Sequence, residues 1–325
     1  MSSKLGEIYV GLTQQGAPIH SVFSPPVSGA LGAVSTTILG GEGITLKMQS
    51  DTERKLNEQI KEMQEKMKVM ASENRDAKVR LTEARLLQSK YDLMYILSCI
   101  DQQHHQAFVE SEKNQSLFKD GSTSESFVIS IDIRRSTDLM LKAKSAKDFS
   151  GFISELCTKL CDVIKTKGGV FDKFTGDGIL ASFPVSYSGP DAGLKCLSAA
   201  KECHRVYRDI FHQYRSSFDC IPLDSGLGIG VDFGTVTYVR IPESLTVVGK
   251  PVVYACRLGG CPAFKTAINQ GAYDKICRNG KASLLATEGS VTFKHDGEML
   301  CYFCELQNEP NEYAIPEWQL PAVTQ

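Results

Sequence analysis

Two aspartates lie beside short apolar segments, in positions where they could bind metal ions. Asp132 comes near the end of the apolar run Phe127–Ile133, where an unpaired carboxylate would be costly to bury. Asp177 lies in the sequence T-G-D-G, whose glycines permit a sharp turn. Two carboxylates at adjacent strand ends could hold a pair of divalent ions, which activate a hydroxyl and neutralise phosphate charge. The alternatives are a helix N-cap for Asp132 and an ordinary turn residue for Asp177.

The segments around these aspartates predict alternating strands and helices. Short apolar runs indicate strands, and longer segments with helical periodicity indicate helices. The expected order is β-α-ββ-α-ββ, which favours an α+β sheet with helices on one face, related to the ferredoxin-like arrangement. The predicted elements are strand 127–133, helix 146–165, the hairpin strands 170–174 and 179–183, helix 191–214, and a second strand pair, 224–231 and 235–241, around Asp232-Phe233-Gly234.

A highly charged segment before these elements predicts a long helix. Residues 51–90 contain ten Lys/Arg and eight Asp/Glu, and their apolar positions step by four and three. This is the spacing of a coiled coil, and Asn74 in the seam favours a parallel dimer. The alternative is a single amphipathic helix that packs on the globular domain. The predicted seam consists of Leu56, Ile60, Met63, Met67, Met70, Asn74, Ala77, Leu81 and Ala84.

Composition narrows the function classes. With 36 Lys/Arg, 38 Asp/Glu and a pI near 6.3, a whole-protein affinity for nucleic acid or an anionic membrane is not expected. Residues 8–41 carry no charge, but their prolines and glycines argue against a membrane-spanning helix and favour a flexible or short-stranded leader.

Eleven cysteines without framework spacing predict a reducing, cytoplasmic location. Cys301 and Cys304 lack a second ligand pair for zinc, so buried thiols are expected there.

The segments IDIRRST and FDKFTGDGILASF resemble the two metal-binding motifs of class III nucleotide cyclases. Two later segments, GLGIGVDFGTV and LTVVGKPVVYACRL, extend the resemblance over residues 124–302. It implies a ferredoxin-like cyclase domain that converts a nucleoside triphosphate into a 3′,5′-cyclic monophosphate and pyrophosphate, with active sites shared across a homodimer. The expected organisation is a leader at 1–43, a coiled-coil or signalling helix at 44–117, and a catalytic domain with a C-terminal tail at 118–325.

The resemblance also implies roles for individual residues. Asp132, Asp177 and the carbonyl of Ile133 would hold two divalent ions, Mn²⁺ or Mg²⁺. Arg257 would stabilise the charge that grows on the α-phosphate, acting from the other subunit. Independently of the resemblance, Arg134, Arg135, Ser136 and Thr137 open the following helix or turn, whose free backbone N–H groups favour phosphate oxygens. Arg134 or Arg135 could add charge there, and the alternative for both arginines is simple surface exposure.

The residues that bear on substrate choice resemble different members of the family. Lys173 and Thr246 match the base-reading pair of many bacterial adenylate cyclases, but Val253 stands where the family has a ribose-orienting asparagine. The amino-acid sequences of the motifs most resemble those of the bacterial pyrimidine cyclases of Pycsar anti-phage systems. These enzymes make cyclic UMP or cyclic CMP for a separate cyclic-nucleotide-binding effector. Tyr254 would then help to close the pocket around a smaller base, or would simply pack in the core. An adenylate cyclase and an inactive nucleotide-binding sensor are the alternatives.

Overall fold

The computed structural model describes residues 42–110, 115–241, 244–278, 283–293 and 297–319. The predicted leader, 1–43, lies almost entirely outside this part of the chain. The chain divides into two units, residues 1–76 and 77–325. Helix α1 (Glu42–Cys99) begins in the first unit and ends in the second. No helix in the described part of the chain is both long enough and apolar enough to cross a membrane.

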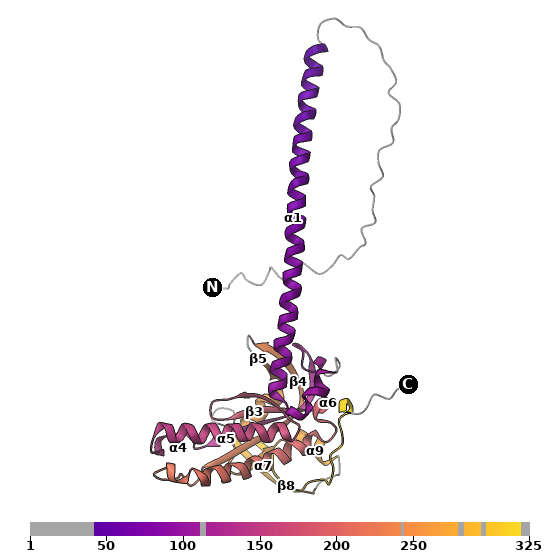
Figure 1. The fold of residues 1–325 in the computed structure, drawn as a ribbon. Coiled ribbons are helices and arrows are strands. Elements are labelled where there is room, and N and C mark those ends of the chain that lie inside the picture. The colour runs from indigo at the N-terminus through magenta and orange to yellow at the C-terminus, as the bar shows by residue number, and fades with distance from the viewer. Residues whose placement is uncertain (1–41, 111–114, 242–243, 279–282, 294–296, 320–325) are drawn as a thin grey trace. The chain divides into compact units, whose positions relative to one another are not determined.

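The second unit is built on one mixed sheet (Figure 1). Its strand order is β2-β3-β1-β4-β6-β8-β7, with β5 paired to β4 off this path. All neighbouring pairs are antiparallel except β4 with β6, which is parallel. The strands are β1 (Thr123–Arg134), β2 (Val170–Phe174), β3 (Ile179–Pro184), β4 (Gly226–Ile241), β5 (Ser244–Val248), β6 (Lys265–Ile268), β7 (Ser283–Phe293) and β8 (Gly297–Asn308).

Both helices predicted by range in this unit form, and no range was predicted for the others. The predicted helices 146–165 and 191–214 correspond to α5 and α7, and the hairpin β2–β3 forms as expected. The helices, with their short 3₁₀ turns, are α2 (His105–Val109), α4 (Ser136–Lys142), α5 (Ala146–Thr166), α6 (Val185–Ser188), α7 (Ala192–Gln213), α8 (Lys250–Leu258), α9 (Gln270–Cys277), η1 (Gln102–His104), η2 (Arg215–Ser217) and η3 (Glu317–Gln319).

The prediction of a second strand pair around Asp232-Phe233-Gly234 was wrong. These residues lie inside the 16-residue strand β4, and Phe233 pairs with Phe127 of β1. The hairpin partner of β4 is β5, which comes later in the chain. Asp and Gly suggested a turn, but Gly234 instead makes room for Pro251 of α8, whose ring would lie 3.0 Å from a Cβ at this position. Glycine inside a strand marks such a close approach as well as a turn.

Helices cover both faces of the sheet, so the expectation of one covered face was also wrong. On one face, Phe127, Ile129 and Ile131 of β1 join the main core with α5 and α7, which lie side by side (Figure 1). The opposite face contacts α8 and a second core that contains Val128. This second core includes Ile96, Cys99 and Ile100, at and just after the end of α1, and Phe108 of α2.

The seam of the predicted coiled coil is exposed in the single chain. Leu56, Ile60, Met63 and Met67 are each 45–64% exposed, and Leu81 is 52% exposed. An exposed apolar seam is the condition that pairing with a second helix requires. The parallel coiled-coil dimer therefore stays a prediction.

Candidate active site

The two aspartates come from neighbouring strands. The β1–β3 ladder ends at the pair Ile131 and Ile179, so Asp132 extends β1 one residue beyond it while Asp177 lies in the turn that precedes β3. Gly178 lets this turn approach β1, because a Cβ there would lie 2.5 Å from the Ile131 carbonyl oxygen. The short connection therefore brings the two carboxylates to the same end of the adjacent strands β1 and β3.

The electrostatics of Asp132 fit a cation site. Burial raises the pKa of Asp132, and the negative charge of Asp177 raises it further, whereas Arg134 opposes both. Arg134 Nη1 lies 2.7 Å from Asp132 Oδ2, and both side chains are a little over one-third exposed. A cation between the two carboxylates would relieve their repulsion. The N-cap alternative for Asp132 was wrong, since the residue lies within β1.

The donor set suits oxygen-binding ions. Within the described ranges, no group of three or more His, Cys, Asp or Glu side chains could hold a metal ion. Asp132 and Asp177 would therefore need further oxygens from the Ile133 carbonyl, water or phosphate, which are ligands that Mg²⁺ and Mn²⁺ accept. Cys301 and Cys304 are both buried in β8, as the buried-thiol interpretation expects.

The predicted phosphate-binding segment forms the start of a short helix. Helix α4 begins at Ser136, and Arg135 before it has φ of 64°, a left-handed conformation that is uncommon for a residue with a side chain. Arg135 and Thr137 are exposed, and Arg135 Nη1 lies 3.1 Å from Asp138 Oδ2. The segment Arg134–Thr137 thus follows Asp132 directly, but phosphate contact by it remains a prediction.

The structure brings the predicted base-reading pair into direct contact. Lys173 Nζ donates to Thr246 Oγ1 at 2.7 Å, joining β2 to β5. Asp172, which the sequence reasoning missed, accepts a 2.7 Å hydrogen bond from the same Thr246 hydroxyl. The β2–β3 register shifts between Phe171 and Lys173, so Asp172 is the extra residue of a bulge. Its only sequence signal was an acidic residue within a short strand.

Helix α8 carries the remaining predicted residues. Val253 is 50% and Tyr254 38% exposed, and Arg257 one turn later is half-buried. The core-packing alternative for Tyr254 was therefore wrong. The part of Tyr254 and Arg257 in an active site stays a prediction, because the partner subunit that would complete it is a separate chain.

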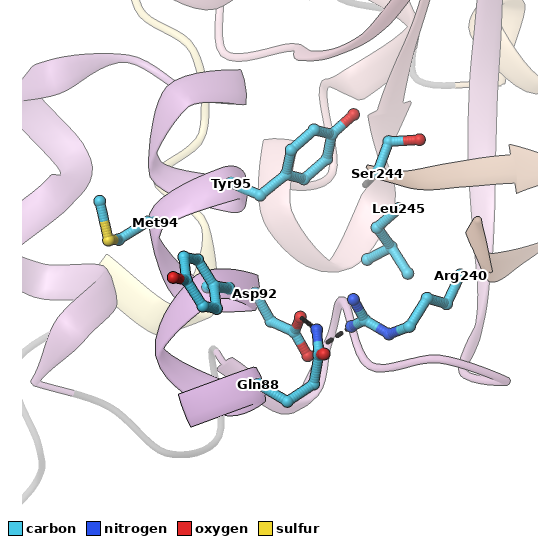
Figure 2. A pocket seen from close by; sticks show the side chains of 8 residues that line it. Gln88, Asp92, Met94, Tyr95, Arg240, Ser244 and Leu245 are labelled. Atoms are coloured by element: carbon cyan, nitrogen blue, oxygen red, sulfur yellow. Dashed lines mark hydrogen bonds and ion pairs between the residues drawn. The ribbon is translucent and has the colours of Figure 1, made fainter. Parts of the chain in front are cut away.

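Asp172, Lys173 and Thr246 are called the Asp172 cluster below. A cavity of about 430 Å³ lies near this cluster, between α1 and the β4–β5 hairpin (Figure 2). Asp92 of α1 forms an ion pair with Arg240, and Gln88 donates to Asp92. Tyr95 donates from its hydroxyl to the Asp172 backbone carbonyl at 3.2 Å. The end of α1 is thus connected to the strands that carry Asp172 and Thr246.

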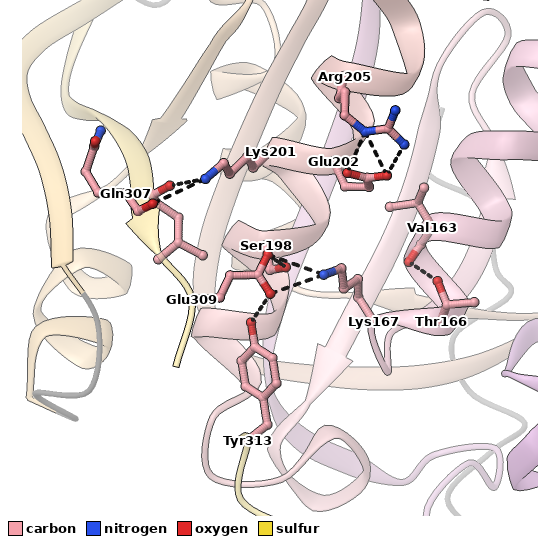
Figure 3. A network of polar contacts seen from close by, with 11 residues as sticks. Val163, Thr166, Lys167, Ser198, Lys201, Glu202, Arg205, Gln307, Glu309 and Tyr313 are labelled. Atoms are coloured by element: carbon pink, nitrogen blue, oxygen red, sulfur yellow. Dashed lines mark hydrogen bonds and ion pairs between the residues drawn. The ribbon is translucent and has the colours of Figure 1, made fainter. Parts of the chain in front are cut away.

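A polar network holds the C-terminal segment against α7 (Figure 3). Glu309 accepts from Ser198 at 2.7 Å and from Tyr313 at 3.1 Å, and it forms an ion pair with Lys167. These contacts stabilise the fold away from the aspartate pair and the Asp172 cluster.

Comparison with known proteins identifies the fold. Neither a family model nor a curated protein sequence matches this chain. Among solved structures, the guanylyl cyclase Cya2 is similar over 61% of this chain and 99% of its own, with a TM-score of 0.50 and 19% identity. The adenylyl cyclase CyaB from P. aeruginosa is similar over 60% and 100%, with a TM-score of 0.50 and 18% identity. The second unit of this chain therefore has the fold of class III nucleotide cyclases, preceded by a long helix.

Proposed function

We propose that this protein is a nucleotide cyclase that converts UTP or CTP into the 3′,5′-cyclic monophosphate and pyrophosphate, acting as a homodimer. The observation that carries the proposal is the approach of Asp132 and Asp177 at one edge of a cyclase-type sheet. The approach depends on Gly178, which has no side chain to collide with the β1 backbone. A lone turn aspartate would not need this close approach.

Asp132, Asp177 and the Ile133 carbonyl would hold two divalent ions, Mn²⁺ or Mg²⁺. Bound ions would lower the pKa of the 3′ hydroxyl and neutralise the triphosphate. Arg134 can release Asp132 and turn to a phosphate oxygen, because their ion pair is partly exposed.

In the reaction, the 3′ hydroxyl gives its proton to solvent water and its oxygen bonds to the α-phosphorus. The bond between the α-phosphorus and the oxygen that bridges it to the β-phosphate breaks, and pyrophosphate leaves. Arg257 from the partner subunit would stabilise the charge on the α-phosphate through its guanidinium group. Arg134, Arg135, Ser136 and Thr137 would position the leaving pyrophosphate group.

The pyrimidine assignment is supported by the surface of α8. The exposed Tyr254 could cover a smaller base. Val253 offers no amide to orient the ribose, but this sugar is common to all four triphosphates, so Val253 does not distinguish between the bases. The contact between Lys173 and Thr246 instead favours the second candidate, a bacterial-type adenylate cyclase. An inactive nucleotide-binding sensor is the third.

The test is incubation of the purified chain with each of the four ribonucleoside triphosphates and Mn²⁺, followed by separation of products by chromatography and mass. Cyclic UMP or cyclic CMP as the main product supports the proposal, and cyclic AMP supports the second candidate. No product from any triphosphate contradicts both. Asp177→Asn is the control that assigns any product to this site.

The proposed biological role is a second messenger in anti-phage defence. It requires an effector that binds the cyclic nucleotide, so a neighbouring gene for such a protein, fused to membrane helices or to a nicotinamide-cleaving domain, would support it. A neighbourhood without any cyclic-nucleotide-binding protein would count against it.

A further inference from the structure

Asp172 is a buried carboxylate whose hydrogen bonds have a defined direction. The residue is 6% exposed. Its Oδ2 accepts from the Thr246 hydroxyl at 2.7 Å, and its Oδ1 accepts from the Val247 backbone N–H at 3.2 Å. A buried carboxylate requires such partners, because leaving it unpaired would cost several kcal/mol.

The bond to Asp172 determines what Thr246 can offer to Lys173. A hydroxyl has one proton, and the ionised carboxylate can only accept. The Thr246 proton is therefore used on Asp172, and the lone pairs of Thr246 remain for the Lys173 ammonium at 2.7 Å. Lys173 Nζ also lies 3.6 Å from Asp172 Oδ2.

The two residues differ in their access to a ligand. Thr246 is 3% exposed, whereas the Lys173 side chain is 45% exposed. An ammonium has three N–H donors, so Lys173 keeps donors for a ligand while one holds it on Thr246. Tyr95 additionally donates to the Asp172 backbone carbonyl, which restrains β2 from the side of α1.

We propose that Asp172 is a positioning residue for base selection: it orients the Thr246 hydroxyl so that Thr246 holds the Lys173 ammonium in place to donate to an acceptor atom of the substrate base. The inference rests on the proposed function, because it concerns the base of the nucleoside triphosphate. The acceptor is a carbonyl oxygen or a ring nitrogen on the edge of the base that faces Lys173.

Substitution of Asp172 by asparagine weakens this arrangement without changing the size of the side chain. The Val247 N–H requires the amide oxygen, so the amide NH₂ faces Thr246. Thr246 then accepts from the amide, and the direction of its own proton is no longer fixed by a carboxylate. Lys173 also loses its 3.6 Å ion pair with Asp172 Oδ2, so its ammonium is held less firmly.

The experiment measures kcat and KM for all four triphosphates with full-length Asp172→Asn, Thr246→Val and Thr246→Ser. We expect KM for the preferred triphosphate to rise about tenfold, equivalent to about 1.4 kcal/mol, in Asp172→Asn and Thr246→Val, with discrimination among bases reduced and kcat changed less. Thr246→Ser keeps the hydroxyl and should restore most of the discrimination lost in Thr246→Val. The double variant Asp172→Asn/Thr246→Val should discriminate no worse than either single variant, because both break the same chain of contacts.

Asp232→Asn is the matched control. Asp232 is also buried in the sheet, 2% exposed, and accepts from a backbone N–H, that of Phe233, at 2.7 Å. It shares no hydrogen bond with Lys173 or Thr246. We expect this variant to keep the KM and the base discrimination of the parent.

Two outcomes overturn the inference. One is an unchanged ratio of KM values among the four bases in Asp172→Asn, and the other is an equal change of that ratio in Asp232→Asn. Binding of 3′-deoxynucleoside triphosphates with Mn²⁺, followed by calorimetry, separates this result from failure of the proposed function. If the parent has no turnover but binds these analogues base-selectively, and Asp172→Asn removes the selectivity, the inference holds and the cyclase activity does not. Binding without base selectivity in the parent overturns the inference as well.

Discussion

The two faces of the first half of β4 differ in the size of their side chains. In β4, Leu227, Ile229, Val231 and Phe233 point to the face covered by α5 and α7. Gly226, Gly228, Gly230 and Gly234 occupy the alternate positions, and α8 with the residues just after it packs against the last three of them. Large apolar residues fill the first face of this stretch of β4, whereas the glycines on the second let the backbone of α8 approach closely.

The glycine positions of the second face lie beside residues of the proposed active site. Asp132 pairs with Gly228 in the ladder and shares its face, and α8 carries Tyr254 and Arg257. A Cβ at Gly230 would lie 2.1 Å from the Ala255 carbonyl oxygen, so α8 has no room to move inward. One face is thus built for stability and the other for placing a helix and a carboxylate.

The largest expected effect is loss of turnover after substitution of either aspartate. Asp132→Asn or Asp177→Asn removes a charged metal ligand, so we expect triphosphate turnover to fall on the order of a thousandfold with only a small change in Tm. Turnover with Mn²⁺ and thermal unfolding measure the two quantities. Asp162 lies at an exposed position of α5, the helix that covers the first face, so Asp162→Asn should change neither turnover nor Tm. Substantial turnover in Asp132→Asn would remove the assignment of chemistry to the second face.

Next in size is the contrast between Ile229→Ala and Gly230→Ala, two neighbours on opposite faces. Ile229 is fully buried, so its truncation should cost about 2–5 kcal/mol in urea unfolding. It should leave the turnover of each folded molecule nearly unchanged. Gly230→Ala should cost about 1–3 kcal/mol by overpacking and should also lower turnover, because α8 must shift. Equal effects of both variants on turnover would contradict the division between the faces.

The coiled-coil prediction extends the contrast to α1, with a smaller expected effect. Met67 lies in the predicted seam and Val69 lies outside it, and both are exposed, at 60% and 51%. Met67→Lys should weaken dimerisation about tenfold in sedimentation experiments, and turnover at low concentration should fall with it, since the proposed mechanism takes Arg257 from the partner subunit. Val69→Lys is the control and should leave both unchanged. If the two variants dimerise equally well, the helix does not pair through this seam.

The smallest effect concerns Asp232, a buried polar group on the second face. Burial raises the pKa of Asp232 to about 6, against hydrogen bonds from Phe233 and Asn269 that lower it. The folded protein therefore binds this proton more tightly than the unfolded chain does, and the stability it contributes below about pH 4 is lost as the pH rises through 6.

The measurement is Tm at pH 4 and pH 7 for the parent and Asp232→Asn. The difference in Tm, variant minus parent, should become more positive at pH 7 than at pH 4. The change should be about 2–4 °C for each kcal/mol of stability that the parent loses as Asp232 ionises. Burial lowers the pKa of His204 to about 4, which gives the opposite pH dependence, but His204 is present in both proteins and cancels. A difference that does not change with pH would contradict the assignment.

The local elements were largely predictable because their signals are local. Periodicity and the T-G-D-G turn located α5, α7 and the β2–β3 hairpin to within one or two residues. The alternating glycines of GLGIGVDFGTV were harder to interpret, because a glycine needed for helix contact and a glycine needed for a turn have the same letter. The sequence reasoning therefore divided β4 in two.

The sequence by itself identified Asp132 and Asp177 as candidate metal ligands and gave their spacing in the chain. It also gave the pairing of Lys173 with Thr246 as a hypothesis. Only the tertiary structure decided that Asp172 joins that pair, because the contact depends on a bulge in β2 and on the hairpin β4–β5 reaching across to it. It also decided that helices cover both faces, since the path of α8 over the glycines of β4 is a long-range contact. Hydrogen-bond direction and close backbone approach arise between segments far apart in the chain, so no pattern within one segment contains them.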